Sequence, residues 1–324
     1  MLCEFAPDSF FLTWAMLTVL GFTIVMLSSS FVFYHYYWGP KVTYDKWTRK
    51  TNPKFPSPAK GIYTATLCPA AAIYLSQQST VSKTLGTLSK AYCSDNPFTD
   101  EEHGGAMGVL IQFLLIVIVS DFWEWGYHRL GHIYPSFWAQ HKHHHVFFNP
   151  SPFAVIADEY VDQFFRALPL FLFPAICPIN MDVMFFTYGV FFYVYGIYLH
   201  WGYEFDLLDA HNPIINTSYH HYLHHAKAIL GKPYHTGFFF KCWDQMTGAV
   251  YPVEKCFCVK CERAKGKRTL AQFKAVHIPD YSVLLTLDFW TGKDAFSGTT
   301  AGDKNEALTE EQKFFASKGA VKAD

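Results

Sequence analysis

The sequence predicts an all-α membrane protein, in which transmembrane helix hairpins carry a cytosolic, histidine-rich dimetal cap. Apolar residues make up 51% of the chain and charged residues only 16%, which is unusual for a soluble domain. The apolar residues gather in long uncharged runs. Twelve of the sixteen histidines lie between residues 125 and 225, and ten of them form three clusters that flank such runs. Together these features predict a metal site held against a membrane.

Five apolar runs build the membrane part. Residues 10–33 and 106–125 each supply about the 20 apolar residues that a spanning helix needs. The run at 61–76 is shorter and predicts either a tilted span or a re-entrant segment. Residues 164–178 contain three prolines, and with residues 181–201 they predict a kinked hairpin that leaves and re-enters on one side of the membrane.

Charge and composition predict the topology and the domain organisation. Aromatic residues 34–38 and the lysines and arginines of residues 41–60 follow the first run, which places this segment in the cytosol and the N-terminus in the lumen. All three histidine clusters then lie on the cytosolic side. We expect a membrane anchor, basic segment and lumenal loop over residues 1–105, a catalytic domain over 106–251, and a basic segment with a flexible tail over 252–324. A net charge of −1 gives no argument for nucleic-acid binding.

The spacing of the histidines is typical of metal ligands. HxxxH places two rings on one face of a helix, one turn apart, and the two later clusters both contain HxxHH. These patterns give eight candidate ligands: His128, His132, His141, His144, His145, His221, His224 and His225. Each neutral imidazole offers one lone pair to a metal. Eight imidazoles are about twice what one zinc ion uses, so they predict two metals, and iron is well suited to imidazole ligands.

Other polar residues near the clusters have less certain roles. Asp121 and Glu124 precede His128 on the same helix face, so we expect them to accept hydrogen bonds from ligand imidazoles. We expect His211 to be an ordinary loop residue. The sequence leaves open whether three further histidines join the site: His143, His220 and His235.

The cysteines permit two interpretations. Cys256, Cys258 and Cys261 form a CxCxxC run, which as a metal site needs a fourth ligand such as Cys242 or His277. Reduced thiols in a cytosolic loop are the simpler interpretation of so short a motif. The remaining cysteines are scattered and predict no disulfide framework.

From about residue 121 to 251 the chain resembles the sterol desaturase and fatty acid hydroxylase superfamily of membrane-bound, histidine-ligated dimetal oxygenases. The superfamily pattern HxxxH, HxxHH and HxxHH occurs in order, and the resemblance adds His200, which follows the last span, to the ligands. The residues around Asp121 look like the superfamily's segment before its first histidines. Residues 239–248 look like its closing F-x-x-WD-x-x-x-G.

The resemblance implies two non-haem iron ions, O2 as co-substrate, and desaturation or hydroxylation of a lipid in the endoplasmic reticulum membrane. It also implies cytochrome b5 and its reductase as electron donors, for which the basic residues 255–268 are a candidate docking surface or merely a solvated face. Residues 149–154 and the pair Val161-Asp162 resemble C-5 sterol desaturases, which makes a sterol the first expected substrate. Desaturases of this group carry a further His before that pair, where this chain reads Asp158-Glu159-Tyr160.

Several alternatives remain at the level of sequence. Other segments resemble C-4 methylsterol oxidases and sphingoid-base C4-hydroxylases, and a fatty acid hydroxylase is a further option. A zinc-binding membrane protein without redox chemistry is an alternative of another class. In a transporter the ligands should lie inside the spans, whereas these histidines lie at or beyond the span ends. A metal-free scaffold is a third hypothesis, against which the complete ligand set argues.

Overall fold

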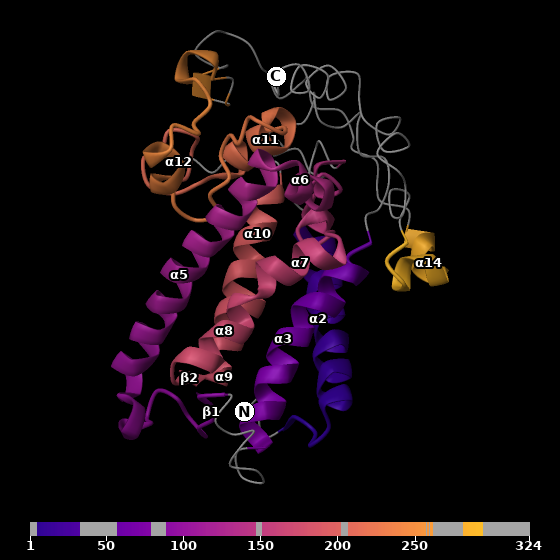
Figure 1. The fold of residues 1–324 in the computed structure, drawn as a ribbon, viewed down its shortest axis with the longest axis vertical. Helices are drawn as coiled ribbons and strands as arrows, with labels where there is room; N and C mark the ends of the chain where they lie inside the picture. Colours follow the sequence, from indigo (N-terminus) through magenta and orange to yellow (C-terminus); the bar gives the residue numbers. More distant parts are fainter. Residues whose placement is uncertain are drawn as a thin grey trace.

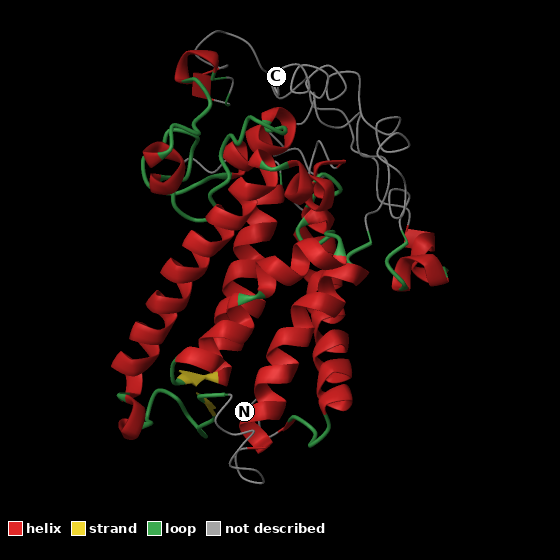
Figure 2. Ribbon diagram, in the orientation of Figure 1, coloured by secondary structure: helices red, strands yellow, loops and turns green. Residues whose placement is uncertain are grey.

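The computed structural model describes residues 5–32, 57–78, 89–146, 151–201, 207–256, 258, 260–261 and 281–293. In these residues the long helices run side by side, and the histidine-bearing segments gather at one end of the bundle (Figures 1 and 2). The predicted all-α membrane fold is therefore confirmed. The aromatic residues 34–38, the basic residues 41–54 and the expected tail beyond residue 293 lie outside the described residues.

Three of the described helices are long and apolar enough to cross a membrane: Phe10–Val32, Gly105–Ile133 and Met181–His200. The first is α2, which pairs with α3 (Ala59–Gln78) in an antiparallel hairpin. The Trp14 indole donates to the Tyr63 carbonyl at 3.0 Å, and the hydroxyls of Thr18 and Thr66 lie 3.0 Å apart. Such bonds satisfy polar groups that face another helix rather than water. The short apolar run at 61–76 thus forms a helix beside α2.

Helix α5 (Gly105–Ile133) carries the first histidine cluster out of the apolar layer. The predicted span ends at residue 125, but the helix continues without a break to Ile133. Helix α6 (Pro135–His141) begins one residue later, with a proline at its first position, where no backbone N–H is needed. A Cβ on Gly131 would lie 3.3 Å from the His141 side chain, so this glycine lets the second cluster approach the first.

The predicted kinked hairpin is confirmed. It descends through α7 (Tyr160–Ala167) and α8 (Pro169–Ile176), which are separated at Leu168. It returns through α9 (Met181–Phe185), a π-helical segment (Phe186–Phe192) and α10 (Tyr193–His200). The wider π turn is a common device near functional sites, and here its side chains line a cavity described below.

The turn between the two arms is fixed by a small sheet. Strand β2 (Ile179–Asn180) pairs in parallel with β1 (Ala91–Tyr92), with Ala91 opposite Ile179. The Asn180 side chain also caps α9, because its oxygen accepts hydrogen bonds from the backbone N–H groups of Asp182 and Val183. This sheet lies at the end of the bundle opposite the histidines (Figure 1).

The remaining helices are short. They are α11 (Ser218–Lys227), α12 (Cys242–Met246) and α14 (Leu287–Trp290). Tight helical turns cover Glu101–His103, His144–Val146, Pro152–Ala154, Val253–Lys255 and Tyr281–Leu285. Helix α14 packs beside α3, where the Ser57 hydroxyl donates to the Phe289 carbonyl at 2.6 Å.

One cysteine departs from the expectation. Cys93, which follows β1, is disulfide-bonded, although the scattered cysteines predicted no disulfide framework. A single Cys has no recognisable disulfide pattern in sequence, because its partner is chosen by the fold.

We expect Gly61→Ala to lower the melting temperature of the purified protein in detergent. A Cβ there would lie 2.0 Å from the Ile156 carbonyl oxygen, and relieving this backbone clash should cost about 1–3 kcal/mol. The matched control is Gly126→Ala in α5, where a Cβ meets nothing within 4 Å and alanine is the better helix former. Equal melting temperatures for the two variants would contradict the close packing of α3.

Candidate metal centre

Nine buried histidines converge at one end of the helical bundle in two adjacent groups. The first group is His128, His132, His141, His145 and His224. The second is His144, His200, His221 and His225. Within each group the nitrogen atoms that could bind a metal all lie within 4.8 Å of one another. The structure therefore brings together all nine histidines that the sequence singled out.

Four helix ends deliver these side chains. The end of α5 supplies two, the end of α6 and the turn after it supply three, and the end of α10 supplies one. Helix α11 supplies the last three, His221, His224 and His225, from one face. Its other face carries Tyr219 and Leu223, which pack in an apolar cluster. This division follows the helical period, since residues three and four apart share a face.

Most of the rings are anchored through Nδ1. The Nδ1 atoms of His128, His200 and His224 lie 3.0, 2.7 and 2.8 Å from the carbonyl oxygens of Thr236, Gly196 and Tyr234, in that order. A carbonyl only accepts hydrogen bonds, so each Nδ1 must carry the proton. The lone pair of each ring is then on Nε2, which faces the interior of its group.

The Nε2 atoms are too close together to be satisfied by protons alone. His145 Nε2 lies 3.0 Å from His224 Nε2 and 3.1 Å from His141 Nε2, and it can donate a proton to only one of them. In the described structure the buried Nε2 atoms of His128 and His132 have no hydrogen-bond partner.

A metal ion resolves this arrangement. At a bond length of about 2.0–2.1 Å, two nitrogens on one metal lie roughly 2.9–3.4 Å apart. The second group has the same spacing, because His221 Nε2 is 3.0 Å from that of His200 and 3.1 Å from that of His225. The residues present thus fit two metal ions, one in each group.

Four of the histidines beyond the spans are held neutral. Burial lowers the pKa of His145, His221, His224 and His225 well below the ordinary value, and the neighbouring imidazoles lower it further. A neutral ring is the form that binds a metal. The set is therefore ready to bind cations at physiological pH.

One carboxylate holds a ring that no carbonyl holds, and a second carboxylate lies beside another ring. His141 Nδ1 lies 2.9 Å from Asp162 Oδ2, and His144 Nδ1 lies 2.9 Å from Asp158 Oδ1. Both carboxylates are fully buried, and the Tyr127 hydroxyl donates to Asp162 at 2.8 Å. The sequence reasoning missed this role. The available signal was a pair of aspartates four residues apart, just after the second cluster.

The expectation for Asp121 is corrected by the geometry. Its carboxylate accepts hydrogen bonds from the backbone N–H groups of Phe239 and Phe240 and, at 2.7 Å, from the Trp243 indole. It therefore fixes the closing segment, whose Thr236 carbonyl meets His128. Among the described residues, Asp121 therefore makes no direct hydrogen bond with a ligand histidine. It holds the backbone at Phe239 and Phe240, close to the Thr236 carbonyl that contacts His128.

Glu124 is also one step removed from the histidines. It accepts a 2.8 Å hydrogen bond from Arg166, which makes a 2.7 Å ion pair with Asp158, the partner of His144. The prediction of a direct bond to an imidazole is corrected here too. Glu124 instead completes a buried chain of alternating charges that fixes Asp158.

The three histidines left open lie outside both groups. His143 Nδ1 is 3.2 Å from Glu159 Oε1. His220 caps its own helix, since its Nδ1 accepts from the Thr217 backbone N–H at 3.3 Å. His235 Nε2 accepts from the Tyr251 backbone N–H at 3.1 Å. Each has a structural partner of its own.

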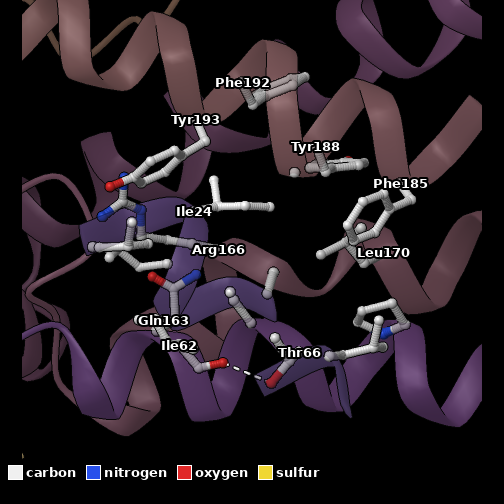
Figure 3. A pocket seen from close by; sticks show the side chains of 18 of the residues that line it. Ile24, Ile62, Thr66, Gln163, Arg166, Leu170, Phe185, Tyr188, Phe192 and Tyr193 are labelled. Carbon is white, nitrogen blue, oxygen red and sulfur yellow. Dashed lines mark hydrogen bonds between the residues drawn. The ribbon is translucent and has the colours of Figure 1, made fainter. Parts of the chain in front are cut away.

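An apolar cavity lies between the helices of the bundle (Figure 3). Its lining comes from α2, α3, α5, α7, α8 and the returning helix, and includes Ile24, Ile62, Leu170, Phe185 and Phe192. Its polar groups include Glu124, Gln163 and Arg166. Gln163 follows Asp162 in the chain, and Arg166 binds Asp158, so this side of the cavity adjoins the ring-holding carboxylates.

Comparison with known proteins agrees with the resemblance seen in the sequence. Residues 113–249 match the family model for fatty acid hydroxylase. The chain is 31% identical over 170 residues to the Delta(7)-sterol 5(6)-desaturase of Aspergillus fumigatus, which covers 52% of this chain and 46% of that protein. It is 32% identical over 155 residues to a Delta(7)-sterol 5(6)-desaturase of Gibberella zeae (46% and 40%). It is 28% identical over 145 residues to the lathosterol oxidase of Homo sapiens (45% and 46%).

The chain spans less than half the length of these curated relatives. No solved structure matches it. The match supports the resemblance to the superfamily for the segment that carries the histidines.

We expect His144→Ala to remove the metal of the second group, so that iron bound per purified chain falls by about half, as measured by elemental analysis. The neighbouring His143→Ala is the matched control, because His143 faces Glu159 and should leave the metal content unchanged. An equal loss in both variants would mean that the segment is sensitive to any substitution, and would count against a specific ligand at residue 144.

We expect Asp162→Asn to weaken metal binding by about 10–100-fold, because a neutral amide stabilises the Nδ1 proton of His141 less than the carboxylate does. Titration of the apoprotein with Fe²⁺ under anaerobic conditions measures this affinity. Glu159→Gln removes a nearby carboxylate that contacts Lys60 and His143, and should bind iron like the wild type. Wild-type affinity in Asp162→Asn would refute the orienting role.

Proposed function

We propose that the chain is a membrane-bound non-haem di-iron oxygenase. It would use O2 to desaturate or hydroxylate a lipid. The similarity of residues 113–249 to the sterol desaturase and fatty acid hydroxylase superfamily supports this proposal. The observation that carries this proposal is the pair of buried histidine groups whose Nε2 atoms face inward at 3.0–3.1 Å spacing. Two groups require two ions, which agrees with a dimetal centre.

The residues have distinct roles in this proposal. The first group would hold one iron and the second group the other. Two irons bound there supply, with O2 and two electrons, an oxidant for an unactivated C–H bond that no side chain provides. Asp162 keeps the Nδ1 proton on His141, so that its Nε2 stays free to bind, and the Asp158 carboxylate lies 2.9 Å from His144 Nδ1. The burial of all nine rings excludes water from the reacting centre.

The proposed substrate is a sterol, with a C-5 desaturase-like reaction in sterol biosynthesis. The similar proteins are named Delta(7)-sterol 5(6)-desaturase and lathosterol oxidase. The cavity in Figure 3 has apolar walls and a few polar groups near the histidines, which suits a lipid with a single polar end. Oxidation of a C-4 methylsterol, a sphingoid base or a fatty acid uses the same centre, and these are the alternatives that the experiment below separates.

The proposed location is the endoplasmic reticulum membrane, with the metal centre facing the cytosol. Cys93 is disulfide-bonded at the end of the bundle opposite the histidines, whereas Cys242, Cys256 and Cys261 near the histidine end are free thiols. Disulfides persist in the oxidising lumen and are rare in the cytosol. This distribution supports the orientation.

Cytochrome b5 and its reductase are the proposed electron donors. Of the basic residues 255–268, Lys255 and Lys260 are described, and the Lys260 side chain is 69% exposed. They lie on the same side as the histidine centre, where an acidic donor would be attracted. A zinc transporter would instead need ligands along its spans, and the nine histidines lie at one end only.

Lipid profiling in yeast tests the proposal. We expect the chain, expressed in a strain that lacks its own C-5 sterol desaturase, to restore the missing sterol double bond as measured by mass spectrometry. His144→Ala should restore nothing, because it removes a proposed ligand. Strains that lack the C-4 methylsterol oxidase or the sphingoid C4-hydroxylase test the alternatives. Restoration only in one of those would replace the sterol desaturase assignment, and restoration by His144→Ala would refute the metal mechanism.

A further inference from the structure

A second cluster of metal-ligating side chains lies outside the nine histidines. His211, Cys256, Cys258 and Cys261 place their ligand atoms within 4.8 Å of one another. His211 Nε2 lies 3.4 Å from Cys258 Sγ and 3.3 Å from Cys261 Sγ. Three sulfurs and one imidazole in a single cluster form a common structural zinc set. We propose that these four residues bind one zinc ion.

The distances suit a tetrahedral ion. With Zn–S bonds of about 2.3 Å and a Zn–N bond of about 2.0–2.1 Å, the ligand atoms of one zinc lie roughly 3.5–3.8 Å apart. The two sulfur–nitrogen distances are within a few tenths of an ångström of this range. All three cysteines are free thiols, so no disulfide competes for the sulfurs. Four protein ligands close the coordination shell, which is the mark of a structural rather than a catalytic zinc.

The fold explains why the sequence pointed to other fourth ligands. Cys242 is exposed and does not belong to the cluster, and His277 lies outside the described residues. His211 precedes the CxCxxC run by about 45 residues and was expected to be an ordinary loop residue. A fourth ligand so far from the cysteines in the sequence cannot be identified from spacing. Only the tertiary structure shows which segment reaches the ion.

The proposed zinc has an evident structural task. Cys258 is fully buried in the apolar cluster on the outer face of α11, where it packs with Tyr219 and Leu223. The opposite face of α11 carries the three ligand histidines. The ion would join the loop before α11 to the segment after Val253–Lys255. It would thereby hold α11 in place on the face opposite the ligand histidines. Helix α11 has only ten residues, and a helix of this length is not stable by itself. The ion would add a tertiary contact that stabilises it.

The Lys241 side chain anchors the same loop. Its ammonium group lies 3.4 Å from the Ala210 carbonyl and also meets the Asn212 carbonyl, on either side of His211. The imidazole is therefore presented to the cysteines by a loop that is held at both flanks. Only His211 among the four ligands is classed as exposed, which gives a metal ion access from the outer surface.

The test is zinc K-edge X-ray absorption spectroscopy on the full-length protein, purified in detergent from zinc-supplemented cells. We expect a sulfur shell at about 2.3 Å from zinc, which nitrogen ligands at about 2.0–2.1 Å cannot produce. The nine-histidine centre contains no sulfur, so its occupancy by zinc or iron does not alter this result. The zinc proposal therefore stands or fails separately from the proposed function.

Variants locate the site. Replacement of Cys256, Cys258 and Cys261 by serine should remove the sulfur shell and one zinc per chain, and the exposed His211→Ala should lower zinc retention during dialysis against a chelator. Cys242→Ser is the matched control and should keep both the sulfur shell and the zinc. His144→Ala should keep the sulfur shell while it loses metal from the histidine centre.

Three outcomes overturn the proposal. They are a wild-type protein without zinc–sulfur scattering, a triple serine variant that keeps it, and sulfur ligation of iron instead of zinc. The wild-type spectrum decides the matter even if the triple variant fails to fold, because it requires no substitution. Dissociation of zinc from the His211→Ala variant at the wild-type rate also counts against the imidazole as fourth ligand.

Discussion

The structure depends on one electrostatic constraint: nine imidazoles are buried with their metal-binding nitrogens gathered at two points. Burial lowers the pKa of rings such as His224, and backbone carbonyls or Asp162 hold the Nδ1 protons of several rings. The inward Nε2 atoms then approach one another at 3.0–3.1 Å, an arrangement that cations stabilise and that protons cannot fully satisfy. A buried polar group without a partner costs free energy. The packing of the rest of the fold must offset this free-energy cost while it keeps the rings in position.

The helices bring the histidines together because the ligand residues lie near the helix ends, which converge. Helix α5 extends past its apolar portion to bring two rings out, and Gly131 allows the His141 side chain to lie against it. The closing segment, held by Asp121, returns a carbonyl to His128. Rings such as His128 and His141 are thus oriented by groups from other parts of the chain, which is how distant segments become one site.

The same network connects the histidines to the apolar cavity. Arg166 lines the cavity and pairs with both Glu124 and Asp158, so a charged chain runs from the cavity wall to His144. The π-helical turn contributes Tyr188 and Phe192 to the opposite wall (Figure 3). A substrate in the cavity would lie beside the groups that fix the second cluster. The membrane helices therefore enclose the cavity as well as anchoring the chain.

The sequence by itself determined the helical membrane class and eight of the nine histidines, while the ninth, His200, came from the resemblance. Both depend on local signals: a long apolar run must be a helix in lipid, and histidines three and four residues apart share a helix face. Only the tertiary structure decided the roles of Asp158 and Asp162, the indirect positions of Asp121 and Glu124, and the meeting of His211 with the CxCxxC run. These are contacts between segments that loops bring together. Their partners depend on how the helices pack, and no periodicity along the chain encodes that.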